Sequence, residues 1–186
     1  MTSSEVIRVA AVSYVRGFDI DRLLVDACER MARRGIRLGG LLQISTGGRG
    51  GCASTVHVVD LRTNRAFDIW EERGQCARGC RLDEGGLAAA SRALDEAIAD
   101  RVDLVIVNRF GRAESLGRGL LPLFSSAVAV GLPVLTAVRA PYDASWTQFH
   151  GGFGSALAPE IEAILGWSER VLPFVKAHLL ESSPTG

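Results

Sequence analysis

Lysine is almost absent from this chain of 186 residues. Of its 21 basic side chains 20 are arginine, and Lys176 is the single lysine. A phosphate site ahead of Lys176 therefore cannot use a lysine. The 21 basic residues are matched by 21 acidic ones. Binders of nucleic acid or of anionic membranes depend on a clustered positive excess. The balance of charge therefore argues against a nucleic-acid partner, and any charged site must be local.

Cysteine is also scarce, and long apolar runs are missing. Four cysteines in 186 residues are too few for a disulfide scaffold. No apolar run reaches the length of about 18 residues that a membrane span needs, and Arg8 interrupts the short apolar stretch near the start. We therefore expect neither a signal peptide nor insertion into a membrane, and a cytoplasmic location with reduced thiols.

The order of apolar patterns predicts an α/β fold. The length suffices for a sizeable core and no linker divides the chain, so we expect one domain over residues 1–186 with a frayed tail at 182–186. The alternation is typical of three layers around a mostly parallel sheet with an inserted β-hairpin. We expect strands at 6–14, 36–44, 103–107 and 133–138, a hairpin of 55–61 and 66–70, and helices that begin after Asp19, open at Asp83, end near Val130 and span about 168–181.

Two motifs resemble known proteins. V-H-V-V-D-L-R-T-N at 56–64 and V-I-V-N-R-F-G-R-A-E at 105–114 resemble the hairpin and the Walker B strand of the P-loop nucleoside-triphosphatase and molybdopterin-guanine-dinucleotide-accessory group. With R-G-C-R-L-D at 78–83, the chain resembles more closely the bacterial family called domain of unknown function 2478, over about residues 6–150. Its members often occur beside molybdate-transport genes, so the resemblance implies a P-loop-like fold and a role in molybdenum handling.

The chemistry of a P-loop is missing from the matching positions. A Walker A loop needs G-x-x-x-x-G-K-[ST] to hold phosphate and magnesium, whereas A-V-S-Y-V-R-G-F-D-I-D at 11–21 has one glycine, no lysine and no hydroxyl after it. Asp19 and Asp21 fall in the first helical turn, where carboxylates satisfy the helix dipole and repel phosphate. Asn108 stands where the family's Walker B aspartate would bind the metal. We therefore predict a degenerate P-loop and no ordinary hydrolysis of ATP or GTP.

Three predicted strand-to-helix loops combine arginine with glycine. Arginine offers a planar fork of donors that matches oxyanions, and glycine lets backbone amides approach them. Such loops meet at the carboxyl ends of the strands of an open α/β sheet. We therefore expect an oxyanion pocket, whose candidate ligand-binding residues are Arg16, Gly17, Arg73, Arg78, Gly79, Cys80, Arg81, Asn108, Arg109, Arg112, Glu114 and Arg118. Scattered arginines of this kind also fit a solvated surface, and Glu114 fits a helix-start acid.

The cysteines do not form a strong metal motif. Cys28 lies on the inward face of the first predicted helix and is expected in the core. Cys76 and Cys80 lie in an arginine-bearing loop and Cys52 in another glycine-rich loop, but C-x-x-x-C without a second pair is a weak zinc signal. We expect no metal site, and the role of Cys52, Cys76 and Cys80 stays open.

Together these features predict a binding protein for a small oxyanion or a related phosphorylated ligand. The resemblance makes molybdate or tungstate the expected ligand, and molybdate-transport or molybdenum-cofactor proteins the expected partners; the sequence identifies no cofactor. We expect binding, storage or delivery, and whether any reaction is catalysed stays open. Two alternatives remain: a divergent nucleotide-binding NTPase that uses arginine in place of the P-loop lysine, and an interaction module that docks its C-terminal helix. A homodimer is compatible with the sequence.

Overall fold

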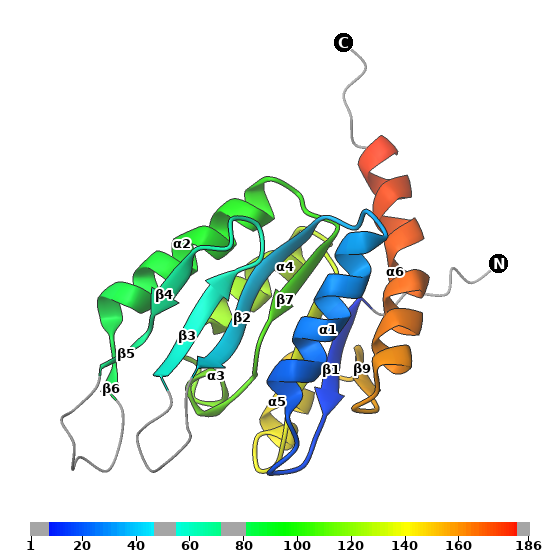
Figure 1. Cartoon of the computed structure of the whole chain (residues 1–186). Helices are drawn as coiled ribbons and strands as arrows, with labels where there is room; N and C mark the ends of the chain where they lie inside the picture. Colours follow the sequence, from blue (N-terminus) through cyan, green and yellow to red (C-terminus); the bar gives the residue numbers. More distant parts are fainter. Residues whose placement is uncertain (1–7, 47–54, 72–80, 182–186) are drawn as a thin grey trace.

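The computed structural model describes residues 8–46, 55–71 and 81–181, without the side chains of 45–46, 55–56, 70–71, 81–82 and 173–181. Strands and helices alternate along most of the described chain (Figure 1). The strands are β1 Val9–Ser13, β2 Leu38–Thr46, β3 Thr55–Asp60, β4 Ala66–Asp68, β5 Trp70–Glu71, β6 Arg81–Leu82, β7 Leu104–Val107, β8 Val134–Val138 and β9 Gly154–Leu157. The helices are α1 Ile20–Arg33, α2 Glu84–Ala99, α3 Arg112–Ser115, α4 Leu121–Ala129, α5 Asp143–His150 and α6 Ile161–Glu181.

Seven strands form one twisted sheet in the order β4-β3-β2-β7-β8-β1-β9. Neighbouring strands from β2 to β9 run parallel, and β3 and β4 add an antiparallel hairpin at one edge. β5 and β6 form a separate two-stranded sheet. The predicted α/β fold with a mostly parallel sheet and an inserted hairpin is therefore confirmed.

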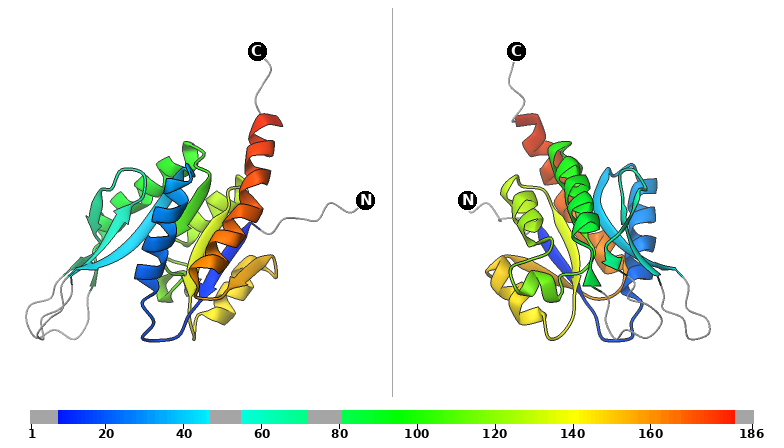
Figure 2. Two further views of the ribbon diagram at one scale, coloured as in Figure 1. Left: turned by 45° about the vertical axis from the view of Figure 1, so that its right-hand side comes forward. Right: turned by 90° about the vertical axis from the view of Figure 1, so that its left-hand side faces the viewer.

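Helices cover both faces of the sheet (Figure 2). α1 and α6 pack on one face, where Leu24 and Trp167 meet alternate strand residues such as Ile106. α2, α4 and α5 pack on the other face, where Phe124 and Trp146 join the second core cluster. β7 and β8 are buried along their whole length because both of their faces are covered. The structure therefore has the three predicted layers.

Local sequence signals set the ends of the first two helices. Asp19 is the N-cap of α1, and its carboxylate accepts from the amide of Arg22. Asp83 is the N-cap of α2, and its carboxylate accepts from the amides of Gly85 and Gly86. Both caps agree with the prediction, because an N-cap needs only residues within one turn.

The V-D-L motif closes the hairpin between β3 and β4. Asp60 is only 1% exposed, and its carboxylate accepts from the amide of Arg62 at 3.1 Å and from the hydroxyl of Thr63 at 2.6 Å. Arg62 in turn pairs with Glu96 and Asp100 of α2. The motif therefore has a structural role, since it shapes a tight turn and ties it to the neighbouring helix.

Several elements differ from the sequence prediction. The helix predicted to end near Val130 is α4, and the short α3 precedes it. α6 begins at Ile161, ahead of the predicted start near 168. β9 was not predicted, because G-S-A-L contains no β-branched or aromatic residue. It pairs with β1, Gly154 beside Val9, and so forms the edge of the sheet opposite β4.

Among the described residues, no helix has both the length and the apolar character needed to cross a membrane.

Candidate functional site

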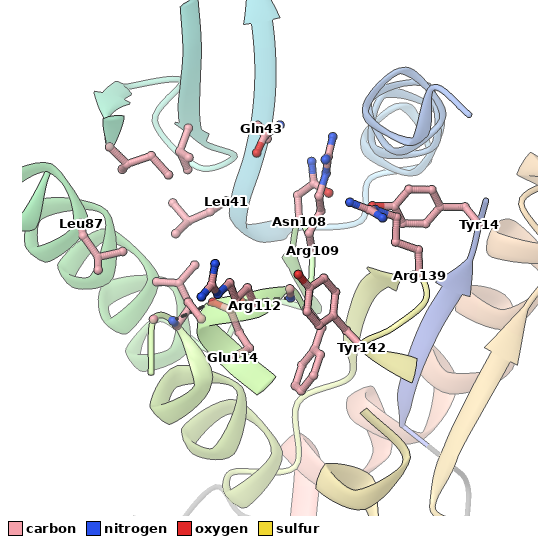
Figure 3. Close-up of a pocket in the computed structure, with 17 residues that line it drawn as sticks. Tyr14, Leu41, Gln43, Leu87, Asn108, Arg109, Arg112, Glu114, Arg139 and Tyr142 are labelled. Atoms are coloured by element: carbon pink, nitrogen blue, oxygen red, sulfur yellow. Dashed lines mark hydrogen bonds between the residues drawn. The ribbon is translucent and has the colours of Figure 1, made fainter. Parts of the chain in front are cut away.

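A pocket of about 360 Å³ opens at the end of the sheet where β1, β7 and β8 finish (Figure 3). This is the position where parallel α/β sheets bind ligands. Arg112 and Glu114 approach it from α3, and Tyr14, Arg139 and Tyr142 from the opposite side. The pocket is lined by Tyr14, Leu41, Gln43, Val58, Ile69, Leu87, Asn108, Arg109, Phe110, Gly111, Arg112, Ala113, Glu114, Gly119, Leu120, Arg139 and Tyr142.

The structure brings together only part of the predicted set. Four of the predicted residues, all from the N-R-F-G-R-A-E motif, line the pocket: Asn108, Arg109, Arg112 and Glu114. The predicted residues Arg16, Gly17 and Arg118 do not line it. Arg73, Arg78, Gly79 and Cys80, with Cys52 and Cys76, lie outside the described residues, and Arg81 starts β6 without a described side chain.

An ion pair joins the start of α1 to the loop that follows β7. The Asp21 carboxylate accepts from Arg109 Nη2 at 2.6 Å and from Asn108 Nδ2 at 2.7 Å. Gln43 Nε2 of β2 lies 3.3 Å from the same carboxylate. The Asp21 side chain is 15% exposed and that of Arg109 is 35% exposed. The negative charge of Asp21 thus offsets one of the pocket's arginines.

Arg109 has an unusual backbone conformation. Its φ is 77°, in the left-handed region that residues other than glycine rarely adopt. The amides on either side are fixed: that of Asn108 donates to Leu41 at 2.9 Å and that of Phe110 to Ala137 at 3.0 Å. Phe110 is buried and contacts Trp146 edge-on, with ring centroids 5.2 Å apart. The anchored neighbours hold Arg109 at the pocket.

Two buried polar atoms of Asn108 and Arg109 have no hydrogen-bond partner in the described part of the chain. They are Asn108 Oδ1, an acceptor, and Arg109 Nε, a donor. Buried polar groups of folded proteins are nearly always paired, so each exception needs an explanation. A third unpaired atom, Trp167 Nε1, lies in the core away from the pocket. The unpaired buried atoms of the site therefore belong to the first two residues of the N-R-F-G-R-A-E motif.

Glu114 shapes the loop around α3. Its Oε2 accepts from the amide of Gly111 at 3.0 Å and its Oε1 from the amide of Leu120 at 3.1 Å. Gly119 has a φ of 63°, and a Cβ there would lie 2.4 Å from Glu114 Oε1. Both carboxylate oxygens are therefore engaged by the backbone, which agrees with a helix-start acid.

Arg112 and Arg139 are the pocket's two guanidinium groups without a carboxylate partner in the described ranges. Arg112 is exposed, and Arg139 is half-buried and donates to the carbonyl of Ala140 at 3.3 Å. The lining thus carries three arginines and one carboxylate, with Asp21 offsetting Arg109. The remaining positive charge is available to an anion.

Four polar residues of the lining were not predicted from the sequence: Tyr14, Gln43, Arg139 and Tyr142. Arg139 directly follows the predicted strand 133–138, so its place at the carboxyl end of a strand was a usable signal. Tyr14 similarly ends the first predicted strand. Gln43 had no such signal, because it lies within a strand and reaches the pocket only through the long β2.

Cys28 belongs to the core, as predicted. It is buried among the residues of α1 and the sheet, and burial raises the pKa of its thiol to about 12. Among the described residues, no group of three His, Cys, Asp or Glu side chains is arranged to hold a metal ion.

Comparisons with known proteins agree on the family and on the fold. Over 160 residues the chain is 41% identical to the molybdenum import ATP-binding protein ModC 2 of Bradyrhizobium diazoefficiens, a match that covers 86% of this chain and 18% of that protein. The solution structure of a human cancer-related nucleoside triphosphatase superposes with a TM-score of 0.60 at 14% identity, over 95% of this chain and 99% of the other. That likeness confirms the predicted nucleoside-triphosphatase-like fold. Residues 9–167 match the family described as Protein of unknown function (DUF2478), and the chain belongs to this family.

Proposed function

We propose that this protein binds a small oxyanion, such as molybdate or tungstate, or a related phosphorylated ligand, in the pocket between α3 and the ends of β7 and β8. Its role is binding, storage or delivery in molybdenum handling. One observation carries the proposal: Arg112 and Arg139 line the same pocket without a carboxylate partner in the described residues. Guanidinium groups bind oxyanions through two parallel hydrogen bonds.

The relation to a molybdenum import protein supports molybdate as the first anion to test. The chain spans only 18% of that protein's length, so the ATP binding in its name belongs to the whole relative. Partners from molybdate transport or molybdenum-cofactor synthesis remain part of the proposal.

The start of α1 supports a ligand other than a nucleoside triphosphate. Asp19 already accepts from an amide of the first turn, and Asp21 adds a second carboxylate beside it. A triphosphate placed at this helix start would face two negative charges, where a nucleotide-binding loop offers free amides and a lysine. Charge at the start of α1 therefore favours an anion held by Arg112 and Arg139 over a triphosphate held at this helix start.

Isothermal titration with molybdate and tungstate tests the proposal. We expect binding by the unaltered chain and a loss of roughly tenfold or more in affinity for Arg112→Ala and for Arg139→Ala, since a hydrogen bond to a charged group contributes about 1.5–3 kcal/mol. Arg170→Ala is the matched control, because Arg170 is exposed on α6 and does not line the pocket. Absence of heat and of thermal stabilisation with every oxyanion tested would overturn the proposal.

The alternative of a divergent NTPase is tested with the same preparation. It requires magnesium-dependent release of phosphate from ATP or GTP, and we expect no release above a blank without protein. Sustained turnover that Arg112→Ala abolishes would favour the alternative.

A further inference from the structure

Two guanidinium groups lie across the pocket from each other. Arg112 comes from α3, on the side where Leu87 lies, and Arg139 comes from the end of β8, on the opposite side (Figure 3). A guanidinium group has N–H donors and no acceptor. Arg139 gives one of its bonds to the carbonyl of Ala140 at 3.3 Å, which leaves its other donors for a ligand. An anion in the pocket is therefore offered donors from two opposite walls.

The carboxylates at the pocket are already engaged. Glu114 is the one carboxylate of the described lining, and its two oxygens accept from backbone amides at 3.0 and 3.1 Å. Asp21 lies beside the lining, and it accepts from the side chains of Gln43, Asn108 and Arg109. A carboxylate is the strongest side-chain acceptor for an acidic O–H. A ligand O–H would therefore find no free carboxylate oxygen among the described residues.

The other side-chain acceptors of the described lining are uncharged. They are the hydroxyls of Tyr14 and Tyr142, the side-chain oxygen of Gln43 and the unpaired Oδ1 of Asn108. A hydroxyl hydrogen rotates to suit its partner, so beside an anion both tyrosines act as further donors. The Oδ1 atom of Asn108 is buried and out of a ligand's reach. The described lining thus offers an anion many donors and few acceptors.

From this imbalance, and resting on the proposed function, we propose that the pocket selects anions that carry no acidic proton. Molybdate, tungstate and sulfate belong to this class near neutral pH, and so does a phosphate monoester in its dianionic form. Hydrogen phosphate and hydrogen arsenate keep one O–H. In the pocket this proton would face guanidinium donors, so a hydrogen bond is lost and a donor is left unpaired.

Such selection separates anions that charge alone does not separate. Molybdate and hydrogen phosphate are both tetrahedral and both carry two negative charges, so the net charge of the lining acts on them equally. The pattern of donors and acceptors differs between them, because every oxygen of molybdate accepts and one oxygen of hydrogen phosphate donates. The pocket can therefore hold molybdate in the presence of inorganic phosphate.

The test uses a pair of anions that differ in this one proton. In monofluorophosphate a fluorine replaces the hydroxyl of hydrogen phosphate, at the same charge and nearly the same size. Isothermal titration on the full chain at about pH 8 compares molybdate, monofluorophosphate and inorganic phosphate. We expect monofluorophosphate and molybdate each to bind at least tenfold more tightly than phosphate, because one hydrogen bond to a charged group separates them.

Two variants show whether the arginines cause this preference. Arg112→Ala should weaken the binding of monofluorophosphate and bring its affinity to within threefold of that for phosphate, because water that replaces the guanidinium can accept the proton. Arg170→Ala is the matched control and should keep the preference, since Arg170 is exposed on α6 and does not line the pocket. An unchanged preference in Arg112→Ala would overturn the role given to this arginine.

The outcomes distinguish the two proposals. If molybdate binds and monofluorophosphate binds no more tightly than phosphate, the pocket does not select by the proton; the inference is then refuted and the proposed oxyanion function stands. If none of the anions binds, both proposals fail.

Discussion

Replacement of Asp21 by asparagine should strengthen the binding of anions while it weakens the fold. Asp21 accepts hydrogen bonds from Arg109 and Asn108 at 2.6 and 2.7 Å, and Arg109 lines the pocket. Asparagine keeps the shape of the side chain and removes its charge. Arg109 then retains one acceptor but is no longer offset by a carboxylate, so a third guanidinium becomes available to a pocket anion.

The size of the gain follows from Coulomb's law. At a separation of about 6 Å, two unit charges interact by roughly 3 kcal/mol at an effective dielectric constant of about 20 and by under 1 kcal/mol in water. The Arg109 side chain is 35% exposed, so a value between these limits applies. We expect a gain of about 1.4 kcal/mol for molybdate or a phosphate monoester, which corresponds to about tenfold in Kd.

The cost to the fold should be modest. The ion pair is neither fully exposed nor fully buried, and one hydrogen bond of the carboxylate is lost, so we expect a destabilisation of about 1 kcal/mol. For a chain of this length that lowers Tm by about 2–4 °C. Asp21→Asn should thus bind the anion more tightly while its fold is less stable. A general loss of folded protein would weaken both binding and stability.

Titration calorimetry and thermal unfolding of Asp21→Asn measure both effects, and Asp26→Asn is the control. Asp26 lies on the same helix, pairs with Arg22 at 3.1 Å and does not line the pocket. Asp26→Asn changes the net charge of the protein by the same amount as Asp21→Asn, but it should leave the Kd of the anion within twofold. Weaker anion binding by Asp21→Asn, with the fold intact, would refute the assignment of Asp21 as a competitor of the ligand for Arg109.

The remaining predictions concern two glycines and the core cysteine. Gly40→Ala should destabilise the protein by more than about 3 kcal/mol, because the φ of Gly40 is +121° and a Cβ there would lie 1.8 Å from the carbonyl oxygen of Ile106. Gly166→Ala should instead stabilise α6 by about 0.5–1 kcal/mol. Urea unfolding of both variants tests these predictions, and equal unfolding midpoints would contradict them. Cys28 should resist alkylation at pH 8 in the folded chain and react in guanidinium chloride, since burial raises the pKa of its thiol to about 12. Because the unfolded thiol ionises from about pH 9 while the folded one stays protonated, Cys28 should also contribute a loss of stability as pH rises above about 9, a loss that Cys28→Ala should reduce. Fast modification of the folded chain, followed by mass spectrometry of the Cys28 peptide, would show the burial to be incorrect.

Those parts of the fold that depend on neighbouring residues could be predicted from the sequence. The caps Asp19 and Asp83 need only the next turn, and β7 is an apolar run that is buried on both faces. β9 could not be predicted, because G-S-A-L has no strand preference of its own and becomes a strand only by pairing with β1, over 140 residues away in the chain.

The candidate site shows the same division. The N-R-F-G-R-A-E motif directed attention to Asn108, Arg109 and Arg112, and all three line the pocket. The partners of Asp21 could not be inferred, because they lie 87 and 88 residues further along the chain. Local patterns specify which groups are present, whereas packing decides which charge each group faces.

The short strands at the two edges of the sheet bear on how the protein can associate. β4 has three residues and β9 has four, while the apolar β1 lies between β8 and β9. An exposed β1 would present an apolar edge of five residues with unpaired backbone groups, the kind of edge that recruits strands from other chains. Deletion of residues 153–157 should therefore make the protein more prone to aggregate. Association of the intact protein should proceed through side chains of its helices and loops.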